Sequence, residues 1–160
     1  MRLEPGQCRE RFSAADHAVL AVNDAGGSPL VVPITFAVVQ DQDGAQFVVF
    51  AVDHKPKSGA PLRRMLLLAA DPRAAVLVEH YGADWQQLWW VRVDGRAEIH
   101  PPDQPPDRPS GGAGAVATDA SPRQVALAAL AAKYPQYVER PPEGDLVAIQ
   151  VDHWSGWAYT

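Results

Sequence analysis

The chain has 160 residues, a formal net charge of −5 and an apolar content of 47%. This length suits a single domain over residues 1–160 with a hydrophobic core of its own. The acidic charge argues against nucleic acid as a partner, and no apolar run approaches the roughly 20 residues of a membrane span. With one cysteine, no internal disulfide and no apolar leader segment, the expected location is the cytoplasm.

The first third of the chain predicts a short helix and then three strands. The helix is expected over residues 3–12, and the strands over residues 17–23, 30–39 and 46–52. Turn signals separate the strands at hairpin spacing, which is typical of antiparallel β structure. Pro33 interrupts the second strand and cannot donate to a ladder, so that strand is expected at a sheet edge or a bulge.

The middle of the chain predicts another short helix and two longer strands. The helix is expected over residues 61–70, where apolar side chains share one face, and Pro72 follows its end. The strands are expected over residues 73–81 and 88–100. Gly95 interrupts the alternation of the second strand and is expected to let it bend, as the wall of a barrel requires.

The last third begins with residues 101–120, whose proline and glycine content predicts a flexible loop. A capping-box pattern from Ser121 to Gln124 then starts a helix. Strands over residues 146–151 and 156–159 complete the chain. Six to seven strands with a few short helices predict a mainly β protein, built as a small closed or half-open barrel.

A basic cluster follows the third predicted strand. Lys55, Lys57, Arg63 and Arg64 fall within ten positions and are four of the 14 basic residues of an acidic chain. A compact cluster of this kind suits one small anionic group, such as the phosphate of a cofactor or nucleotide. Composition alone leaves open a solvated loop whose lysines protect a strand edge.

No catalytic motif accompanies the basic cluster. The five histidines share no metal-type spacing, and the sequence lacks GxSxG, GxGxxG and a complete P-loop. An enzyme with this sequence would therefore take its reactive chemistry from a bound cofactor, with no catalytic side chain and no metal. Tryptophans could stack on a planar heterocycle, or pack in a core or a dimer interface, and for Trp90 we favour an interface or a ligand.

Five segments follow one another in an order that resembles a known superfamily. They are VPITF (32–36), FVVFAVDHKPKSG (47–59), LRRMLLLAADPRAAVLVEHY (62–81), WWVRVDGRAEI (89–99) and DHWSGWAYT (152–160). This order is similar to the split β-barrel flavin-binding superfamily that includes pyridoxamine-phosphate oxidase, and within it to the actinobacterial class B flavin/deazaflavin oxidoreductases linked to coenzyme F-420.

The resemblance implies a split β-barrel homodimer with the cofactor at its interface. The implied activity is hydride transfer from reduced coenzyme F-420, a deazaflavin, to a small organic acceptor. The alternatives are an FMN-dependent oxidase or reductase on the same fold and a non-catalytic flavin- or deazaflavin-binding protein. Coenzyme F-420 carries a polyglutamate tail, so a basic channel beyond the phosphate site would favour it, and Arg92 and Arg96 are the candidates.

The same resemblance implies which residues bind the cofactor. The basic residues after the third strand would hold its phosphate, and the backbone around the proline of the second strand would line its ring system. Two further strand ends would lie beside the ring or the ribityl chain, and a C-terminal tryptophan would approach from the partner chain. The implied cofactor-binding residues are Lys55, Lys57, Ser58, Arg63, Arg64, Pro33, Ile34, Thr35, Val49, Phe50, Ala51, Val78, Glu79, His80, Tyr81, Trp154 and Trp157.

Overall fold

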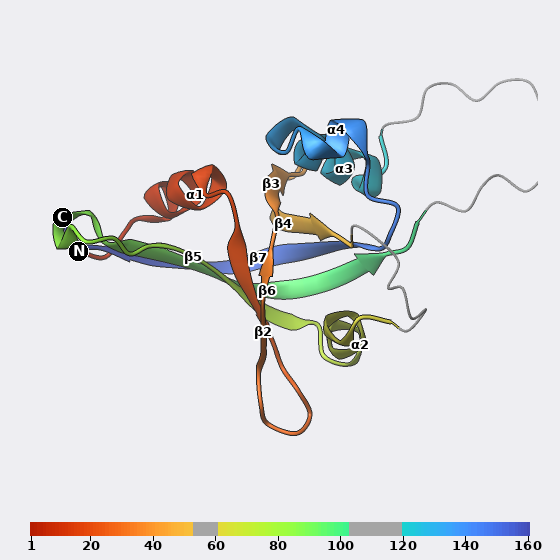
Figure 1. The fold of residues 1–160 in the computed structure, drawn as a ribbon, viewed down its shortest axis with the longest axis horizontal. Coiled ribbons are helices and arrows are strands. Elements are labelled where there is room, and N and C mark those ends of the chain that lie inside the picture. The colour runs from red at the N-terminus through yellow and green to blue at the C-terminus, as the bar shows by residue number, and fades with distance from the viewer. Residues whose placement is uncertain (53–60, 103–119) are drawn as a thin grey trace, which may run out of the picture.

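The computed structural model describes residues 1–52, 61–102 and 120–160. In this part of the chain, seven strands form one antiparallel sheet in the order β2-β1-β5-β6-β7-β4-β3 (Figure 1). The strands are β1 (Ala18–Val22), β2 (Leu30–Ile34), β3 (Ala37–Gln40), β4 (Gln46–Ala51), β5 (Arg73–His80), β6 (Trp89–His100) and β7 (Leu146–Ala158). The helices are α1 (Pro5–Ala14), α2 (Arg63–Ala70), α3 (Pro122–Lys133) and α4 (Gln136–Glu139), and η1 (Trp85–Gln87) is a short 3-10 turn.

The sheet curls into a half-open barrel. β2 and β3 are its two edge strands, yet only Thr35 and Phe36 separate them in the sequence. A sheet whose opposite edges are joined by a two-residue link must bend round on itself. The mainly β split barrel predicted from the sequence is therefore confirmed, and the link, which we call the β2–β3 junction, is the point where the barrel turns back.

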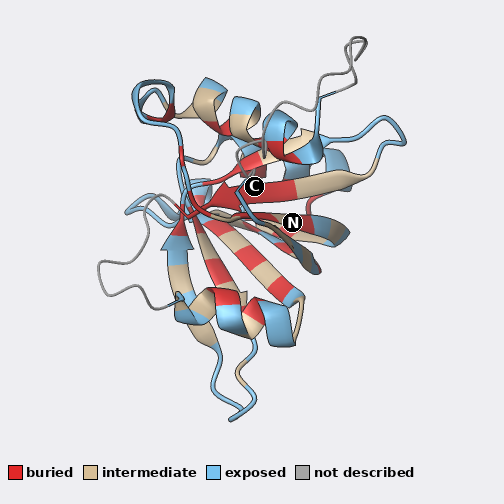
Figure 2. Cartoon of the chain, turned by 90° about the vertical axis from the view of Figure 1, so that its right-hand side faces the viewer, coloured by how far each residue is buried: buried red, intermediate tan, exposed pale blue. Residues whose placement is uncertain are grey.

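Alternation of burial, clearest along β1 and β5, fills the barrel. In β1, Ala18, Leu20 and Val22 are buried while the residues between them are partly exposed, and Figure 2 shows the same banding along neighbouring strands. Phe12 from α1 inserts its fully buried ring among these side chains, 4.9 Å from the Phe36 ring at an edge-on angle. Inward apolar residues at every second position are what an antiparallel sheet with one buried face requires.

Helix α3 forms a second, smaller core on the outside of β3 and β4 (Figure 1). Its predicted start is confirmed, because the Ser121 hydroxyl accepts from the Gln124 backbone N–H at 3.2 Å and the Gln124 side chain accepts from the Ser121 backbone N–H at 2.9 Å. Buried Ala126 and Leu130 then pack toward Val49. None of the described helices is long and apolar enough to cross a bilayer.

Three strands predicted from the sequence have different bounds in the structure. The stretch expected as one strand over residues 30–39 is two strands, and the break falls at Thr35 and Phe36 rather than at Pro33. Pro33 remains inside β2 opposite Val19, which is possible because β2 is an edge strand with a free side. The two strands expected near the C-terminus are the single strand β7, which pairs with the long strand β6 on both sides of Asp152.

The β6–β7 ladder shifts register between Asp94 and Gly95, where Asp152 of β7 has no ladder partner. This β-bulge lets the two strands follow the barrel wall at the bend that Gly95 predicted. A Cβ atom on Gly95 would lie 2.1 Å from the Gln150 carbonyl oxygen, so the two backbones touch there. Most of the predicted flexible loop, residues 103–119, lies outside the described residues. Helix α4 was not expected from the sequence.

Candidate functional site

A cavity of about 290 Å³ opens beside the β2–β3 junction. We call it the junction pocket. It gathers residues from the start of β1, the end of β2, the end of β4 and the first turn of α2, four segments that are far apart in the sequence. Its lining residues are His17, Pro33, Ile34, Thr35, Ala51 and Arg64. All of them except His17 are among the cofactor-binding residues implied by the sequence resemblance.

Arg64 brings a positive charge to the lining of the junction pocket. Its Nε atom is buried and has no hydrogen-bond partner among the described residues. A buried N–H group of a permanently charged guanidinium is unfavourable unless an acceptor reaches it. The residues present therefore fit an occupant that carries an anionic group.

Arg63, the preceding residue, is committed elsewhere. Its guanidinium forms an ion pair with Asp24 after β1, and its side chain is 67% exposed. The Gly26 backbone N–H and then Arg63 lower the pKa of Asp24 below its ordinary value. The sequence left open which of the two arginines faces the site, and the structure places Arg64 there.

Three of the implied residues are buried in packing rather than exposed to a cavity. Phe50 and Val78 belong to the barrel core, and Val49 lies under α3. Their neighbour Ala51 is the one residue of its strand that lines the junction pocket. Successive strand residues point to opposite faces, so a consecutive run of three could not all face one ligand.

The end of β5 lines a different cavity, of about 310 Å³. There the His80 ring stacks on Trp89 with centroids 6.3 Å apart, and the Arg11 guanidinium lies 5.3 Å from the Trp89 ring centroid. Glu79 and Tyr81 on either side of His80 are exposed. Within one chain these residues do not line the junction pocket.

The two implied tryptophans also lie apart from the junction pocket. The Trp154 indole N–H donates to Gln46 at 2.8 Å, and its ring packs edge-on against Phe12 at 5.2 Å. Trp157 lies opposite Trp90 in the β6–β7 ladder. Lys55, Lys57 and Ser58 lie outside the described residues.

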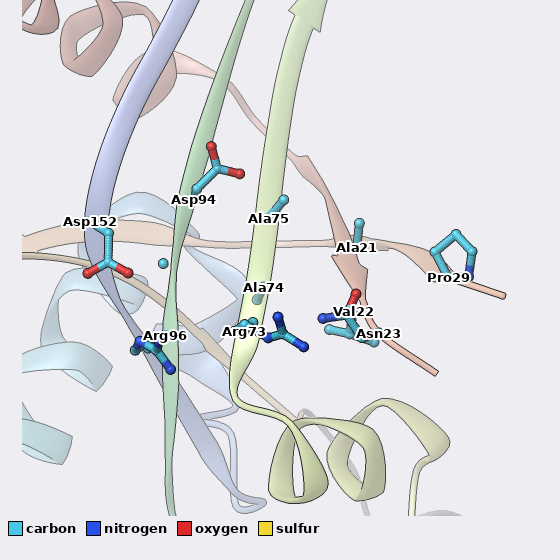
Figure 3. Close-up of a pocket in the computed structure, with 11 residues that line it drawn as sticks. Ala21, Val22, Asn23, Pro29, Arg73, Ala74, Ala75, Asp94, Arg96 and Asp152 are labelled. Carbon is cyan, nitrogen blue, oxygen red and sulfur yellow. The ribbon is translucent and has the colours of Figure 1, made fainter. Parts of the chain in front are cut away.

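A further cavity, of about 370 Å³, lies at the other end of β1 (Figure 3). Its charged lining is balanced, with Arg73 and Arg96 against Asp94 and Asp152. Arg73 already binds Asp71 through two nitrogens, at 3.0 and 2.7 Å. This cavity is therefore less suited to binding an anion than the junction pocket is.

Arg92 and Arg96, the candidates for a polyglutamate channel, differ in their surroundings. Arg92 is paired with Asp94 at 2.8 Å, which leaves it little free charge. Arg96 lines the cavity of Figure 3 and has no hydrogen-bond or ion-pair partner in the part of the chain that the structure describes. The two do not form a continuous basic channel with Arg64 along the described surface.

Comparison with known proteins was made at three levels. The profile of the pyridoxamine 5'-phosphate oxidase family matches residues 5–158. Among solved structures, a FAD-binding protein from Mesorhizobium loti is 21% identical with a TM-score of 0.62, and the match covers 98% of this chain and 93% of that one. The conserved hypothetical protein Rv2991 from Mycobacterium tuberculosis is 17% identical with a TM-score of 0.65, covering 98% and 86% of the two chains.

A FAD binding protein from Mycobacterium smegmatis is 16% identical with a TM-score of 0.57, and the match covers 100% of each chain. At these identities the solved structures establish the fold. A search of curated proteins finds no significant match. The family profile, in contrast, spans nearly the whole sequence, from the start of α1 to the last residue of β7. The chain belongs to the pyridoxamine 5'-phosphate oxidase family.

Proposed function

We propose that this protein is an oxidoreductase that transfers a hydride from reduced coenzyme F-420 to a small organic acceptor. The observation that carries the proposal is that Arg64, a cation whose Nε has no hydrogen-bond partner among the described residues, lines the junction pocket. In the sequence, Lys55 and Lys57 stand between Ala51 and Arg64, both of which line that pocket. A phosphate held by these cations would leave the ring system beside the junction.

The protein's own residues would bind and orient the cofactor and the acceptor, and none of them would transfer a proton. Pro33, Ile34 and Ala51 give the pocket apolar lining, and the side chain of Thr35 carries a hydroxyl group. When bound, a reduced deazaflavin would supply the hydride, and the acceptor would stack on its exposed face. Close stacking and exclusion of water are then the main requirements on the protein.

A flavin is the second candidate. Two of the similar structures are described as FAD-binding proteins, and FMN enzymes share this fold by resemblance. A flavin phosphate would use the same cations as a deazaflavin phosphate. The incomplete basic channel around Arg92 and Arg96 favours this alternative, because a polyglutamate tail would find few free cations there.

The proposed assembly is a homodimer with the cofactor at its interface. One face of the sheet carries partly exposed apolar side chains. Val31 on β2 is 56% exposed and pairs with Ala21 on β1, and on the same face Val19 of β1 pairs with Leu77 of β5. Trp90 and Trp157, opposite one another, continue this face on β6 and β7. Joining two such faces would remove apolar surface from water and bring the partner's tryptophans toward the junction pocket.

Titration decides between the cofactors. Purified protein is mixed with coenzyme F-420, FMN or FAD, and the quenching of cofactor fluorescence gives each dissociation constant. We expect coenzyme F-420 to bind most tightly, and tighter FMN or FAD binding would favour the flavin enzyme. Binding without turnover of any electron acceptor would favour the non-catalytic carrier, and binding of none of the three would refute the proposal.

The double variant Lys55→Ala/Lys57→Ala tests the phosphate assignment in the same assay. A charge-assisted hydrogen bond contributes about 1.5–3 kcal/mol, so each lysine should account for about a tenfold to hundredfold change in affinity. Thermal unfolding of the ligand-free variant should stay close to that of the wild type. If the affinity is unchanged, the two lysines do not bind the phosphate and belong to a solvated loop that protects a strand edge.

A further inference from the structure

The β2–β3 junction is held by a side chain from the far end of the chain. The Phe36 backbone N–H donates to the Tyr134 hydroxyl at 3.0 Å. The same hydroxyl lies 2.9 Å from the Phe36 carbonyl oxygen and 2.8 Å from the Asp16 carbonyl oxygen, and it can donate its one proton to either. One hydroxyl therefore joins the segment before β1 to the link between β2 and β3.

Two neighbouring side chains strengthen this attachment. The Tyr137 hydroxyl and the Thr35 Oγ1 are 2.8 Å apart and share a hydrogen bond. The Lys133 Nζ lies 3.8 Å from the centroid of the buried Phe36 ring. The end of α3 and the start of α4 thus hold both residues of the junction, and Figure 1 shows the two helices together beside β3.

These contacts lie directly behind the junction pocket. Thr35 lines the pocket, and so does His17, which directly precedes β1 and follows Asp16. No residue of α3 or α4 lines the pocket itself. The junction residues belong to neither flanking strand, so sheet pairing alone does not fix their conformation.

We propose that Tyr134 and Tyr137 are positioning residues of the junction pocket. They hold its walls at His17 and Thr35 in the geometry that cofactor binding needs, without touching the cofactor. The inference rests on the proposed function, since the occupant is the cofactor. A binding site whose backbone is already ordered loses less conformational entropy when the ligand arrives, so loosening the junction should weaken binding.

Three tyrosine variants test the proposal in the cofactor titration. Tyr137→Phe should raise the dissociation constant about two- to tenfold, the usual value of one hydrogen bond, and Tyr134→Phe should raise it further because that hydroxyl holds both walls. Tyr159→Phe is the matched control, since this tyrosine is 51% exposed and its hydroxyl makes no hydrogen bond in the described structure. Affinities are compared at a temperature where every variant is folded. Wild-type affinity in both Tyr134→Phe and Tyr137→Phe would overturn the proposal.

A double-mutant cycle separates positioning from a general loss of stability. Tyr137→Phe and Thr35→Val each remove the hydrogen bond between the two hydroxyls, so the loss of affinity in the double variant should be smaller than the sum of the two single losses. Thr35→Ser keeps the hydroxyl and should retain most of the affinity. Fully additive losses would mean that the two hydroxyls do not act through one another.

Hydrogen exchange of the ligand-free protein tests the role of the tyrosines without depending on which cofactor binds. The Phe36 amide should exchange faster in Tyr134→Phe than in the wild type or Tyr159→Phe. Unchanged exchange would overturn the positioning role whichever cofactor binds. Failure of the wild type to bind any of the three cofactors would refute the proposed function, and with it the role of the tyrosines in binding, while faster exchange would still establish their hold on the junction.

Discussion

At the scale of single residues, two adjacent arginines differ in what they are free to do. Arg63 is paired with Asp24 at the surface, whereas Arg64 keeps a buried N–H without a partner in the junction pocket. Adjacent residues of a helix point about 100° apart, so neighbours at its first turn face different surroundings. The chemical identity of the side chain is the same, and its location decides whether it can bind an anion.

Substituting these arginines one at a time gives a matched pair. Arg64→Gln should weaken cofactor binding about tenfold or more, because a charge-assisted hydrogen bond to a phosphate is lost. Arg63→Gln should change affinity little, since its partner is Asp24. Fluorescence titration of both variants makes the comparison, and equal losses would contradict the assignment of Arg64 to the site.

Lys133 provides a prediction for the pH dependence of stability. Burial lowers the pKa of its ammonium group to about 8, an effect that the charge of Asp16 partly offsets. Between pH 8 and the ordinary lysine value of 10.5, the unfolded chain binds a proton that the folded protein does not, so the free energy of unfolding should rise with pH. The side chain is partly exposed, so the rise should be only about 1 kcal/mol.

Urea unfolding between about pH 7.5 and 9 would measure this rise. The upper limit avoids the titration of Cys8 and Tyr134, because burial raises the pKa of both groups and each would give the opposite slope at higher pH. Lys133→Met places an apolar chain over the Phe36 ring and should remove the pH-dependent increment. If the free energy of unfolding of Lys133→Met still rises with pH, the rise comes from another titratable group.

At the scale of elements, the bulge at Asp94 and Gly95 lets the longest strands of the sheet curve together. β6 and β7 pair from Trp89 to His100, with one shift of register at the bulge. A continuous unbulged pair of that length would twist without bending as sharply. Glycine is required at the bulge because the opposite backbone occupies the space of a Cβ atom.

Gly95→Ala should therefore destabilise the fold. Its Cβ would lie 2.1 Å from the Gln150 carbonyl oxygen and 2.9 Å from Ile149 Cγ2, and overpacking of this kind typically costs about 1–3 kcal/mol. In Gly82→Ala the nearest atom is His80 Nε2 at 3.8 Å, so the change should stay within about 0.5 kcal/mol. Equal unfolding midpoints of the two variants in urea would show that β6 and β7 can move apart at the bulge without a loss of stability.

At the scale of the whole molecule, the proposed dimer depends on the apolar outer face of β1, β2 and β5. Leu77→Glu places a carboxylate in the middle of that face, opposite Arg92 in the ladder, where the carboxylate stays hydrated in a monomer and would be buried in the dimer. It should turn a dimer into a folded monomer, as light scattering would show. Val138→Glu on α4, at a position 68% exposed, is the control and should remain dimeric. A wild-type monomer at micromolar concentration would refute the dimer.

Local patterns in the sequence were enough to predict most of the elements. Period-two alternation predicted antiparallel strands, the segment from Ser121 to Gln124 predicted a helix start, and Gly95 predicted a bend. Each depends on interactions between residues a few positions apart or on the pleat of one strand. The break between β2 and β3 was misplaced, because a proline suggests an interruption, yet at the edge of a sheet it leaves the ladder intact.

The basic cluster and the segment around Pro33 were evident in the sequence, and the likeness to a family linked them. Only the tertiary structure decided that Arg64 rather than Arg63 faces the pocket, and that Val49 and Phe50 are buried away from it. It alone brought Tyr134 to Phe36, across 98 positions of the chain. Local preferences act through neighbouring residues and can be read in order, whereas a pocket forms between segments whose approach is determined by how the whole barrel closes.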